Sequence, residues 1–160
     1  MEIRFAQAQD RAGILSLLAQ IGQLHYQGRP DIFRRDALKY DEKAFLALLQ
    51  DKDRPVLVAV EEGRVLGYAF CIHKVVQNHP VLADESSLYI DDLCVDEAAR
   101  GKGIGTALYE AVVALARETG VQRITLNVWA FNESALAFYQ KCGMKMQRIF
   151  METPLEEPKC

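Results

Sequence analysis

The stretch that most constrains this fold covers residues 88–108 and reads LYIDDLCVDEAARGKGIGTAL. Its first half is apolar apart from Asp91 and Asp92, which predicts a strand over about residues 87–95. A basic, glycine-rich turn follows and leads directly into an alanine-rich segment with helical periodicity. The predicted order is therefore a strand, a turn that can bind an anion, and a helix.

Glycine occupies alternate positions of this turn, at Gly101, Gly103 and Gly105. Without Cβ atoms the backbone can direct its N–H groups toward a bound anion, and the helix dipole adds a favourable field, so phosphate is the expected ligand. The turn is not a P-loop, because GK is followed by Gly, and it lacks the last glycine and the acidic residue of a dinucleotide fingerprint. The alternative is a helix start that binds nothing.

The segments on either side show strand and helix patterns in turn. Upstream we expect a strand at Glu2–Phe5, a helix capped by Asp10, a connecting or lid segment at 22–40, a helix from Asp41, and a hairpin of strands 56–60 and 65–76. Downstream we expect a helix that buries Leu108 and Ala116, a strand at 123–129, a helix capped by Asn132, and a last strand at 144–153. This order predicts the α/β (α+β) class, a mixed sheet with helices on both faces.

Length and composition fit a single hydrophobic core. The chain has 160 residues, of which half are apolar, so we expect one domain over residues 1–154 and a short tail at 155–160. A net charge of -3 without a basic cluster argues against nucleic acid as a partner, so we expect none. No apolar run approaches the ~18 residues of a membrane span, and the polar N-terminus is unlike a secretory signal, so we expect a cytoplasmic protein with no membrane partner.

The cysteine spacing argues against a metal centre. Cys71, Cys94, Cys142 and Cys160 form no CxxC pair, and no histidine lies at ligand spacing from them. We therefore expect no metal site. A core of this size needs no disulfides, so reduced thiols are the simplest interpretation.

Two motifs together resemble the Gcn5-related N-acetyltransferase (GNAT) family. RGKGIG matches the family's acetyl-CoA signature, Q/R-x-x-G-x-G/A, with Arg100, Gly103 and Gly105 in its three specified positions. Further along, NESALAFYQKCGM is similar to the family's second signature, in which Asn132 opens a helix that carries Tyr139. The resemblance covers residues 89–144, and upstream only the order of the elements matches.

The resemblance implies a GNAT-like fold, which is a twisted, mostly antiparallel sheet with a central parallel strand pair. It implies acetyl-CoA as the cofactor, with the pantetheine arm paired to the backbone of residues 93–95 and the pyrophosphate on the amides of residues 100–105. Many family members are dimers, so a homodimer is an expectation, with the oligomeric state left open. The cofactor-binding residues expected from the resemblance are Leu93, Cys94, Val95, Arg100, Gly101, Lys102, Gly103, Ile104, Gly105, Thr106, Asn132, Ala135 and Tyr139.

Acetyl transfer to an amine requires a group that removes an ammonium proton, and Asp91 and Asp92 are the candidates. Polyamine-type members of the family carry a pair of acids at the matching place. Adjacent residues of a strand point to opposite faces, so at most one carboxylate is expected to face a given pocket, and we prefer Asp91 to Asp92. The alternative is a strand end that reaches solvent, or an ion pair with a nearby Arg or Lys.

The departing thiolate requires an acid, and the second motif offers Tyr139 for this role. The alternative is an ordinary aromatic residue on the buried side of a helix. Cys94 is a candidate for an acetylated nucleophile, although a cysteine in an apolar strand is usually inert packing. His73 is a second candidate base or a structural residue.

The acceptor is the least determined part of the interpretation. By the resemblance, His25, Tyr26, Arg29 and Phe33 lie where the family forms its acceptor pocket, but the same segment also suits a solvated loop. We expect an N-acetyltransferase that moves the acetyl group of acetyl-CoA to a primary amine of a small molecule or peptide, by direct attack in a ternary complex. The alternatives are a non-catalytic acyl-CoA-binding or regulatory module of the same fold and an unrelated nucleotide-binding α/β enzyme.

Overall fold

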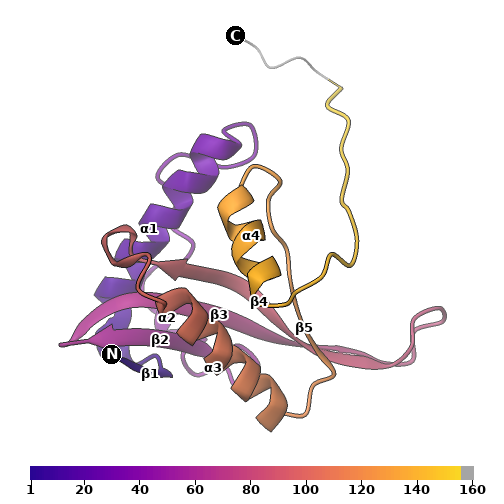
Figure 1. Cartoon of the computed structure of the whole chain (residues 1–160), viewed down its shortest axis with the longest axis horizontal. Helices are drawn as coiled ribbons and strands as arrows, with labels where there is room; N and C mark the ends of the chain where they lie inside the picture. Colours follow the sequence, from indigo (N-terminus) through magenta and orange to yellow (C-terminus); the bar gives the residue numbers. More distant parts are fainter. Residues whose placement is uncertain (156–160) are drawn as a thin grey trace.

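A computed structural model describes residues 1–155 and shows a five-stranded sheet in the order β1-β2-β3-β4-β5 (Figure 1). Neighbouring strands from β1 to β4 are antiparallel, and β4 and β5 are parallel. The mixed sheet predicted from the sequence is therefore confirmed. The strands are β1 (Glu2–Phe5), β2 (Val56–Glu61), β3 (Arg64–Val76), β4 (Glu85–Val95) and β5 (Arg123–Leu126).

Helices cover both faces of this sheet, as predicted. They are η1 (Ala8–Asp10), α1 (Arg11–Gly28), α2 (Glu42–Leu48), η2 (Glu97–Ala99), α3 (Ile104–Glu118) and α4 (Glu133–Lys141). The alternation along β2 divides the core in two: Val56, Val58 and Val60 pack with α1 and α2, whereas Leu57 and Ala59 pack with α3. None of the helices within residues 1–155 is both long and apolar enough to cross a bilayer.

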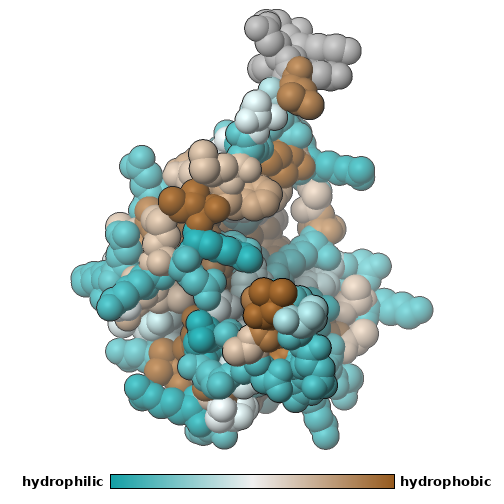
Figure 2. All heavy atoms as spheres, turned by 90° about the vertical axis from the view of Figure 1, so that its right-hand side faces the viewer, coloured by the Kyte–Doolittle hydropathy of each residue, from teal (hydrophilic) through white to brown (hydrophobic). Residues whose placement is uncertain are grey.

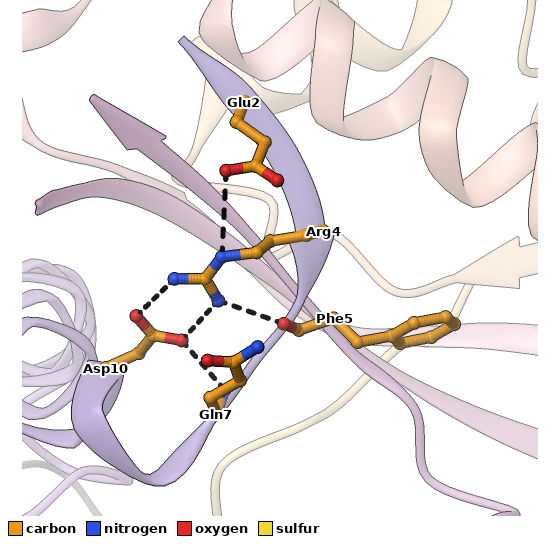
Figure 3. Close-up of polar contacts among 5 residues, drawn as sticks. All are labelled: Glu2, Arg4, Phe5, Gln7 and Asp10. Carbon is orange, nitrogen blue, oxygen red and sulfur yellow. Dashed lines mark hydrogen bonds and ion pairs between the residues drawn. The ribbon is translucent and has the colours of Figure 1, made fainter. Parts of the chain in front are cut away.

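Asp10 lies directly before α1, where the sequence predicts a helix cap, but its carboxylate has a different role. It accepts hydrogen bonds from the Arg4 guanidinium at 2.6 and 2.9 Å and from the backbone N–H of Gln7 at 2.8 Å (Figure 3). The bond to Arg4 lowers the pKa of Asp10, although burial opposes the shift. The pair therefore ties β1 to the start of α1. Asp41, in contrast, caps α2 as predicted, because its side chain accepts from the N–H of Ala44 at 2.7 Å.

The expectation of a connecting segment throughout residues 22–40 is wrong at its start, because α1 continues to Gly28. Contacts between the end of α1 and the segment that precedes α4 favour these additional helical turns. The Phe131 ring fills the space beside Gly28, where an added Cβ would lie 2.4 Å from a ring carbon. Residues 29–41 then connect α1 to α2.

A β-bulge in β4 explains why β5 is shorter than predicted. Phe70 pairs with Asp92 and Cys71 with Ile90, so Asp91 is the extra residue of the bulge. β5 pairs only with residues 87–90 and ends at Leu126, not at residue 129. Because a bulge bends its strand, β4 and β5 diverge beyond this point.

After α4, residues 144–155 form no strand in this chain, which differs from the strand predicted at 144–153. The parallel pair β4–β5 is confirmed as a pair, but it lies at one edge of the sheet in the described residues. Most of the predicted tail, residues 156–160 including Cys160, lies outside the described residues.

Candidate active site

The bulge places both acids of the predicted pair on one side of β4. Asp91 Oδ2 lies 2.8 Å and Asp92 Oδ2 lies 3.9 Å from the ammonium nitrogen of Lys39. The expectation that at most one of the two carboxylates faces a given pocket is therefore wrong. The extra residue at Asp91 breaks the strict alternation of side chains on which that expectation depends.

Lys39 was not anticipated as a site residue. It comes from the connection between α1 and α2, and its ammonium also lies 5.9 Å from the ring centre of Tyr40 and 5.8 Å from that of Phe70. Burial would lower its pKa, but the hydrogen bond to Asp91 and the charge of Asp92 raise it instead. The sequence offers an ion pair with a nearby Arg or Lys as one alternative for the two acids, and Lys39 forms such a pair. Carboxylates in an apolar strand need a counter-charge of this kind.

Asp92 is the more enclosed of the two carboxylates, with 11% of its side chain exposed against 23% for Asp91. The hydroxyl of Tyr68, on β3, donates to Asp92 Oδ2 at 3.0 Å. Burial raises the pKa of Asp92, while Lys39 and the Tyr68 hydrogen bond act in the opposite direction. Asp92 is therefore suited to gain and lose a proton closer to neutral pH than an ordinary aspartate.

One edge of β4 has no strand beside it next to this acidic pair. Residues 92–95 pair with β3 on one side, but β5 ends opposite Ile90. The unpaired edge includes Leu93, Cys94 and Val95, and a ligand with amide groups could add to it as a further strand. The Val95 carbonyl already accepts from the Arg100 side chain at 3.3 Å.

Cys94 points away from this edge and into the core beneath α1. The residue is 3% exposed, and its sulfur lies 3.7 Å from the carbonyl oxygen of Leu17. Burial raises the pKa of this thiol to about 12. Such a thiol is protonated at neutral pH, which disfavours a role as nucleophile. Cys71, Cys94 and Cys142 are all free thiols.

The glycine turn connects η2 to the start of α3. Gly101 and Gly103 both adopt a φ of +79°, which side chains rarely tolerate, and a Cβ at either position would point into open space. No side chain among the described residues caps α3, so the N–H groups of its first turn, including those of Ile104 and Thr106, are available to a ligand. Lys102 is exposed in the same turn. The arrangement fits an anion such as a pyrophosphate.

Gly105 has a packing role that the motif alone does not indicate. It lies inside the first turn of α3, and an added Cβ would lie 3.4 Å from the Phe138 ring of α4. The third glycine therefore allows α4 to approach the turn closely.

α4 begins as predicted, because the Asn132 side chain accepts from the N–H of Ala135 at 3.2 Å and caps the helix. Tyr139 lies on this helix, with its ring centre 6.3 Å from that of Tyr109 on α3. Burial raises the pKa of the Tyr139 phenol, and the charge of Asp92 adds to the shift. Tyr139 therefore keeps its proton at neutral pH and lies close enough to Asp92 to sense its charge.

The four predicted acceptor residues do not gather at one point. His25 and Phe33 stack at 4.9 Å and continue into an aromatic cluster with Trp129 and Phe131. Burial lowers the pKa of His25, and the charge of nearby Lys39 adds to the effect. Of the other two candidates, Tyr26 lies beneath the Arg35 guanidinium and Arg29 pairs with Asp31 and Glu152.

Two further candidates are placed by the structure. His73 lines a hollow of ≈ 320 Å³ with Phe5 and Thr119, together with residues of the α2–β2 connection, and neither acid borders this hollow. No group of three or more His, Cys, Asp or Glu side chains that could hold a metal ion occurs within residues 1–155.

Comparison with known proteins identifies the family. A solved structure of a mutant Bacillus halodurans protein, BH1408, is 36% identical, covers 98% of this chain and 100% of its own, and superposes with a TM-score of 0.93. An uncharacterized N-acetyltransferase of Mycobacterium tuberculosis is 31% identical over 64% of this chain and 60% of its own length. A 5-NmdU N-acetyltransferase of Pseudomonas phage PaMx11 is 38% identical over 54% of each chain.

The chain thus covers only about half to three fifths of these two curated relatives. The model of the acetyltransferase (GNAT) family, in contrast, matches residues 19–144, which include the acidic pair, the glycine turn and Tyr139. With a relative of known structure that aligns over its full length, this match shows that the chain belongs to the GNAT family of acetyltransferases.

Proposed function

We propose that this protein is an acetyl-CoA-dependent N-acetyltransferase whose acceptor is a primary amine on a small molecule or a peptide. The observation that carries the proposal is that Asp91 and Asp92 already hold a primary ammonium, that of Lys39, beside the unpaired edge of β4. A substrate ammonium would bind through the same charge-assisted hydrogen bonds. The names of the curated relatives, which are N-acetyltransferases, also favour nitrogen as the acceptor atom.

The residues around this pair suit acetyl-CoA, which supplies an activated acetyl thioester. The unpaired backbone of residues 92–95 would hold its amide-containing arm, and the amides from Gly101 to Thr106 would hold its pyrophosphate. Open space at Gly101 and Gly103 supports this assignment. Asn132 and Ala135 would act indirectly, because their mutual hydrogen bond fixes the start of α4.

Each of the candidate catalytic groups has one task. A lysine-type amine with a pKa of ~10.4 is almost entirely protonated at pH 7, so Asp91 or Asp92 would bind the ammonium and take its proton, directly or through water. The neutral amine would attack the thioester carbonyl carbon, and the bond between that carbon and sulfur would break. The nitrogen would then lose a second proton, which restores the proton that Tyr139 gives up. Tyr139, which keeps its proton at neutral pH, would donate that proton to the departing thiolate.

The proposal includes direct transfer in a ternary complex, because the Cys94 thiol is buried and protonated and is therefore a poor acetyl carrier. The free thiols at Cys71, Cys94 and Cys142 suit a reducing compartment and favour a cytoplasmic location.

An acceptor screen tests the proposed function. The chain is incubated with acetyl-CoA and polyamines, amino acids, aminoglycosides or peptides, and released CoA is detected as free thiol while the product is weighed by mass spectrometry. We expect at least one primary amine to gain an acetyl group, and an Asp91→Asn, Asp92→Asn double variant to lose this activity while retaining acetyl-CoA binding. Tight binding of acetyl-CoA with no transfer to any amine would instead identify a non-catalytic module.

A further inference from the structure

Lys39 is held differently from the other lysines within residues 1–155. Hydrophilic side chains project from much of the face shown in Figure 2, and solvent is the usual environment of an ammonium group. The Lys39 ammonium instead donates to Asp91 Oδ2 at 2.8 Å and lies 3.9 Å from Asp92 Oδ2. Among the lysines of the described residues, it alone forms an ion pair with a carboxylate.

This ammonium occupies the place that the proposed function gives to the acceptor. Asp91 and Asp92 are the candidate bases, and they adjoin the unpaired edge of β4 at residues 93–95, where the arm of the cofactor is proposed to bind. The Lys39 nitrogen is thus a primary amine beside the groups that would take its proton. The side chain is 36% exposed, so the nitrogen is open to a bound thioester.

Lys39 reaches the site from a connection and not from a regular element, since residues 29–41 contain no helix or strand. The rings of Phe70 and Tyr40 have their centres 5.8 and 5.9 Å from its nitrogen and stabilise a cation there. A tethered nucleophile beside the reaction centre has an effective concentration far above that of a free amine. Lys39 therefore competes well with an acceptor from solution.

We propose that Lys39 is a modification site, and that the protein transfers the acetyl group of its own bound acetyl-CoA to the Lys39 nitrogen. The inference rests on the proposed function, because it uses the same cofactor and the same acidic pair. It goes beyond that function because the acceptor is part of the chain itself.

The reaction forms one N–C bond and breaks one C–S bond. The Lys39 ammonium gives a proton to Asp91 or Asp92, directly or through water, and the neutral amine attacks the thioester carbon. Coenzyme A leaves as a thiol after it takes the proton of Tyr139, and the second proton of the nitrogen restores that tyrosine. A lysine ammonium and acetyl-CoA thus give N-acetyl-lysine, the free thiol and one released proton, with no oxidation or reduction.

Acetylation removes the positive charge that neutralises the acidic pair. A neutral amide is a weaker partner for a carboxylate than an ammonium is, because it carries no charge and has a single N–H. Asp91 and Asp92 then face the site without this counter-charge, and an external ammonium binds them without displacing Lys39. The first turnover of each molecule, on itself, therefore opens the site to its acceptor.

Acetyl-CoA with a heavy-isotope label in its acetyl group tests the modification directly. Full-length wild type is incubated with it in the absence of any added amine, and the labelled lysines are mapped by mass spectrometry of peptides. We expect Lys39 to gain the label at least about tenfold faster than Lys43, an exposed lysine of α2 that lacks the acidic pair beside it. The rate constant should be independent of protein concentration, because donor and acceptor belong to one molecule.

Three controls accompany this measurement. The Asp91→Asn, Asp92→Asn double variant should lose the rapid labelling of Lys39, and Lys39→Arg should leave the slow labelling of Lys43 unchanged. In wild type unfolded by urea, the two lysines should react equally, which gives the comparison even if the double variant fails to fold.

The outcomes separate this inference from the proposed function. Labelling of Lys39 that is no faster than that of Lys43, or a rate constant that rises with protein concentration, would overturn the inference. If that same protein acetylates an added amine, the proposed function stands without it. If neither Lys39 nor any amine is acetylated, the proposed function fails as well.

The effect on acceptor binding gives a second test. Wild type acetylated at Lys39 is freed of coenzyme A and assayed by initial rates with fresh acetyl-CoA and n-butylamine, which is the lysine side chain as a free molecule. KM for n-butylamine should be about three- to tenfold lower than in unmodified protein, because a competing ion pair is lost. Lys39→Arg should keep the same KM before and after incubation with acetyl-CoA. An unchanged KM in the acetylated wild type would contradict the opening of the site.

Discussion

The sheet with the helices α1, α2 and α3 and the region after β5 are built in opposite ways. From Ile14 to Ala116, apolar side chains close into two cores on the two faces of the sheet. After Ala116, no hydrophobic residue of the described chain is fully buried, although this region includes α4 and Tyr139. The first region therefore buries its apolar side chains fully, whereas the second leaves its own at least partly exposed.

A matched pair of leucines gives the largest expected difference between the two regions. Leu108 is fully buried beneath the sheet and Leu155 is 95% exposed. Leu108→Ala should lower the free energy of unfolding by about 3 kcal/mol, because it leaves a cavity in the core, whereas Leu155→Ala should change it by less than about 0.5 kcal/mol. Urea unfolding followed by circular dichroism measures both. Similar losses for the two variants would show that the C-terminal region is packed after all.

A matched pair of glycines separates ligand binding from backbone strain. Gly63 in the β2–β3 turn and Gly103 in the glycine turn have φ of +78° and +79°, and both have open space beside them. Asp at either position costs about 1 kcal/mol of stability, but only Gly103→Asp places a negative charge where a pyrophosphate is proposed. We expect acetyl-CoA affinity, measured by calorimetry, to fall about 100-fold in Gly103→Asp and to stay unchanged in Gly63→Asp. Equal affinities would remove the anion site from this turn.

A pair of tyrosines tests whether α4 takes part in the chemistry. Tyr139→Phe removes the proposed acid, so turnover should fall about 100-fold with acetyl-CoA binding unchanged. Tyr109→Phe is the control, because its ring lies only 6.3 Å away but belongs to the well-packed α3. Steady-state kinetics and calorimetry measure the two quantities. Unchanged turnover in Tyr139→Phe would return that residue to a packing role.

Asp10, between β1 and α1, and Asp92, in the candidate active site, should contribute to the free energy of unfolding with opposite dependence on pH. The pKa of Asp10 is lowered by its bond to Arg4, so its contribution to stability is present above its ordinary pKa of 3.8 and is lost as pH falls. The pKa of Asp92 is raised by burial, so the stability linked to its neutral form is present below 3.8 and is lost as pH rises.

Urea unfolding between pH 3 and pH 7 checks this pair. At pH 7, Asp10→Asn should lower the free energy of unfolding by about 2 kcal/mol, and this loss should become smaller toward pH 3. The free energy of unfolding of Asp92→Asn should rise relative to that of the wild type as pH rises. A cost of Asp92→Asn that grows with pH would show that Lys39 and Tyr68 outweigh burial at this carboxylate.

The sequence predicts those features that depend on local pattern. The Asn132 cap, the glycine turn and the β-branched strand β2 all follow from residue type and spacing, and the structure contains each of them. A bulge is a property of two paired strands, so the placement of both Asp91 and Asp92 toward one ammonium could not be foreseen from β4 alone.

Long-range charge pairing limits the prediction in the same way. The need for a counter-charge near the two acids is visible in the sequence, but the choice of Lys39, fifty-two positions away from Asp91, depends on how the connection between α1 and α2 folds back. Residues 144–153 are likewise strand-like in pattern, and only the fold of residues 1–155 shows that they form no strand of the sheet.

Replacement of Lys39 should give the smallest of these effects, but it tests the acceptor site directly. In the free protein the ammonium of Lys39 occupies the place proposed for the acceptor ammonium. A substrate ammonium must displace it from Asp91, which lies at 2.8 Å, and from Asp92. Lys39→Met keeps the aliphatic stem near Phe70 and removes the competing charge, so KM for the amine should fall about three- to tenfold, as expected for a lost ion pair of about 1 kcal/mol. Lys43→Met, on the exposed side of α2, is the control and should leave KM unchanged. A rise in KM for Lys39→Met would mean that this lysine helps to bind the acceptor, which would then have to carry an anionic group of its own.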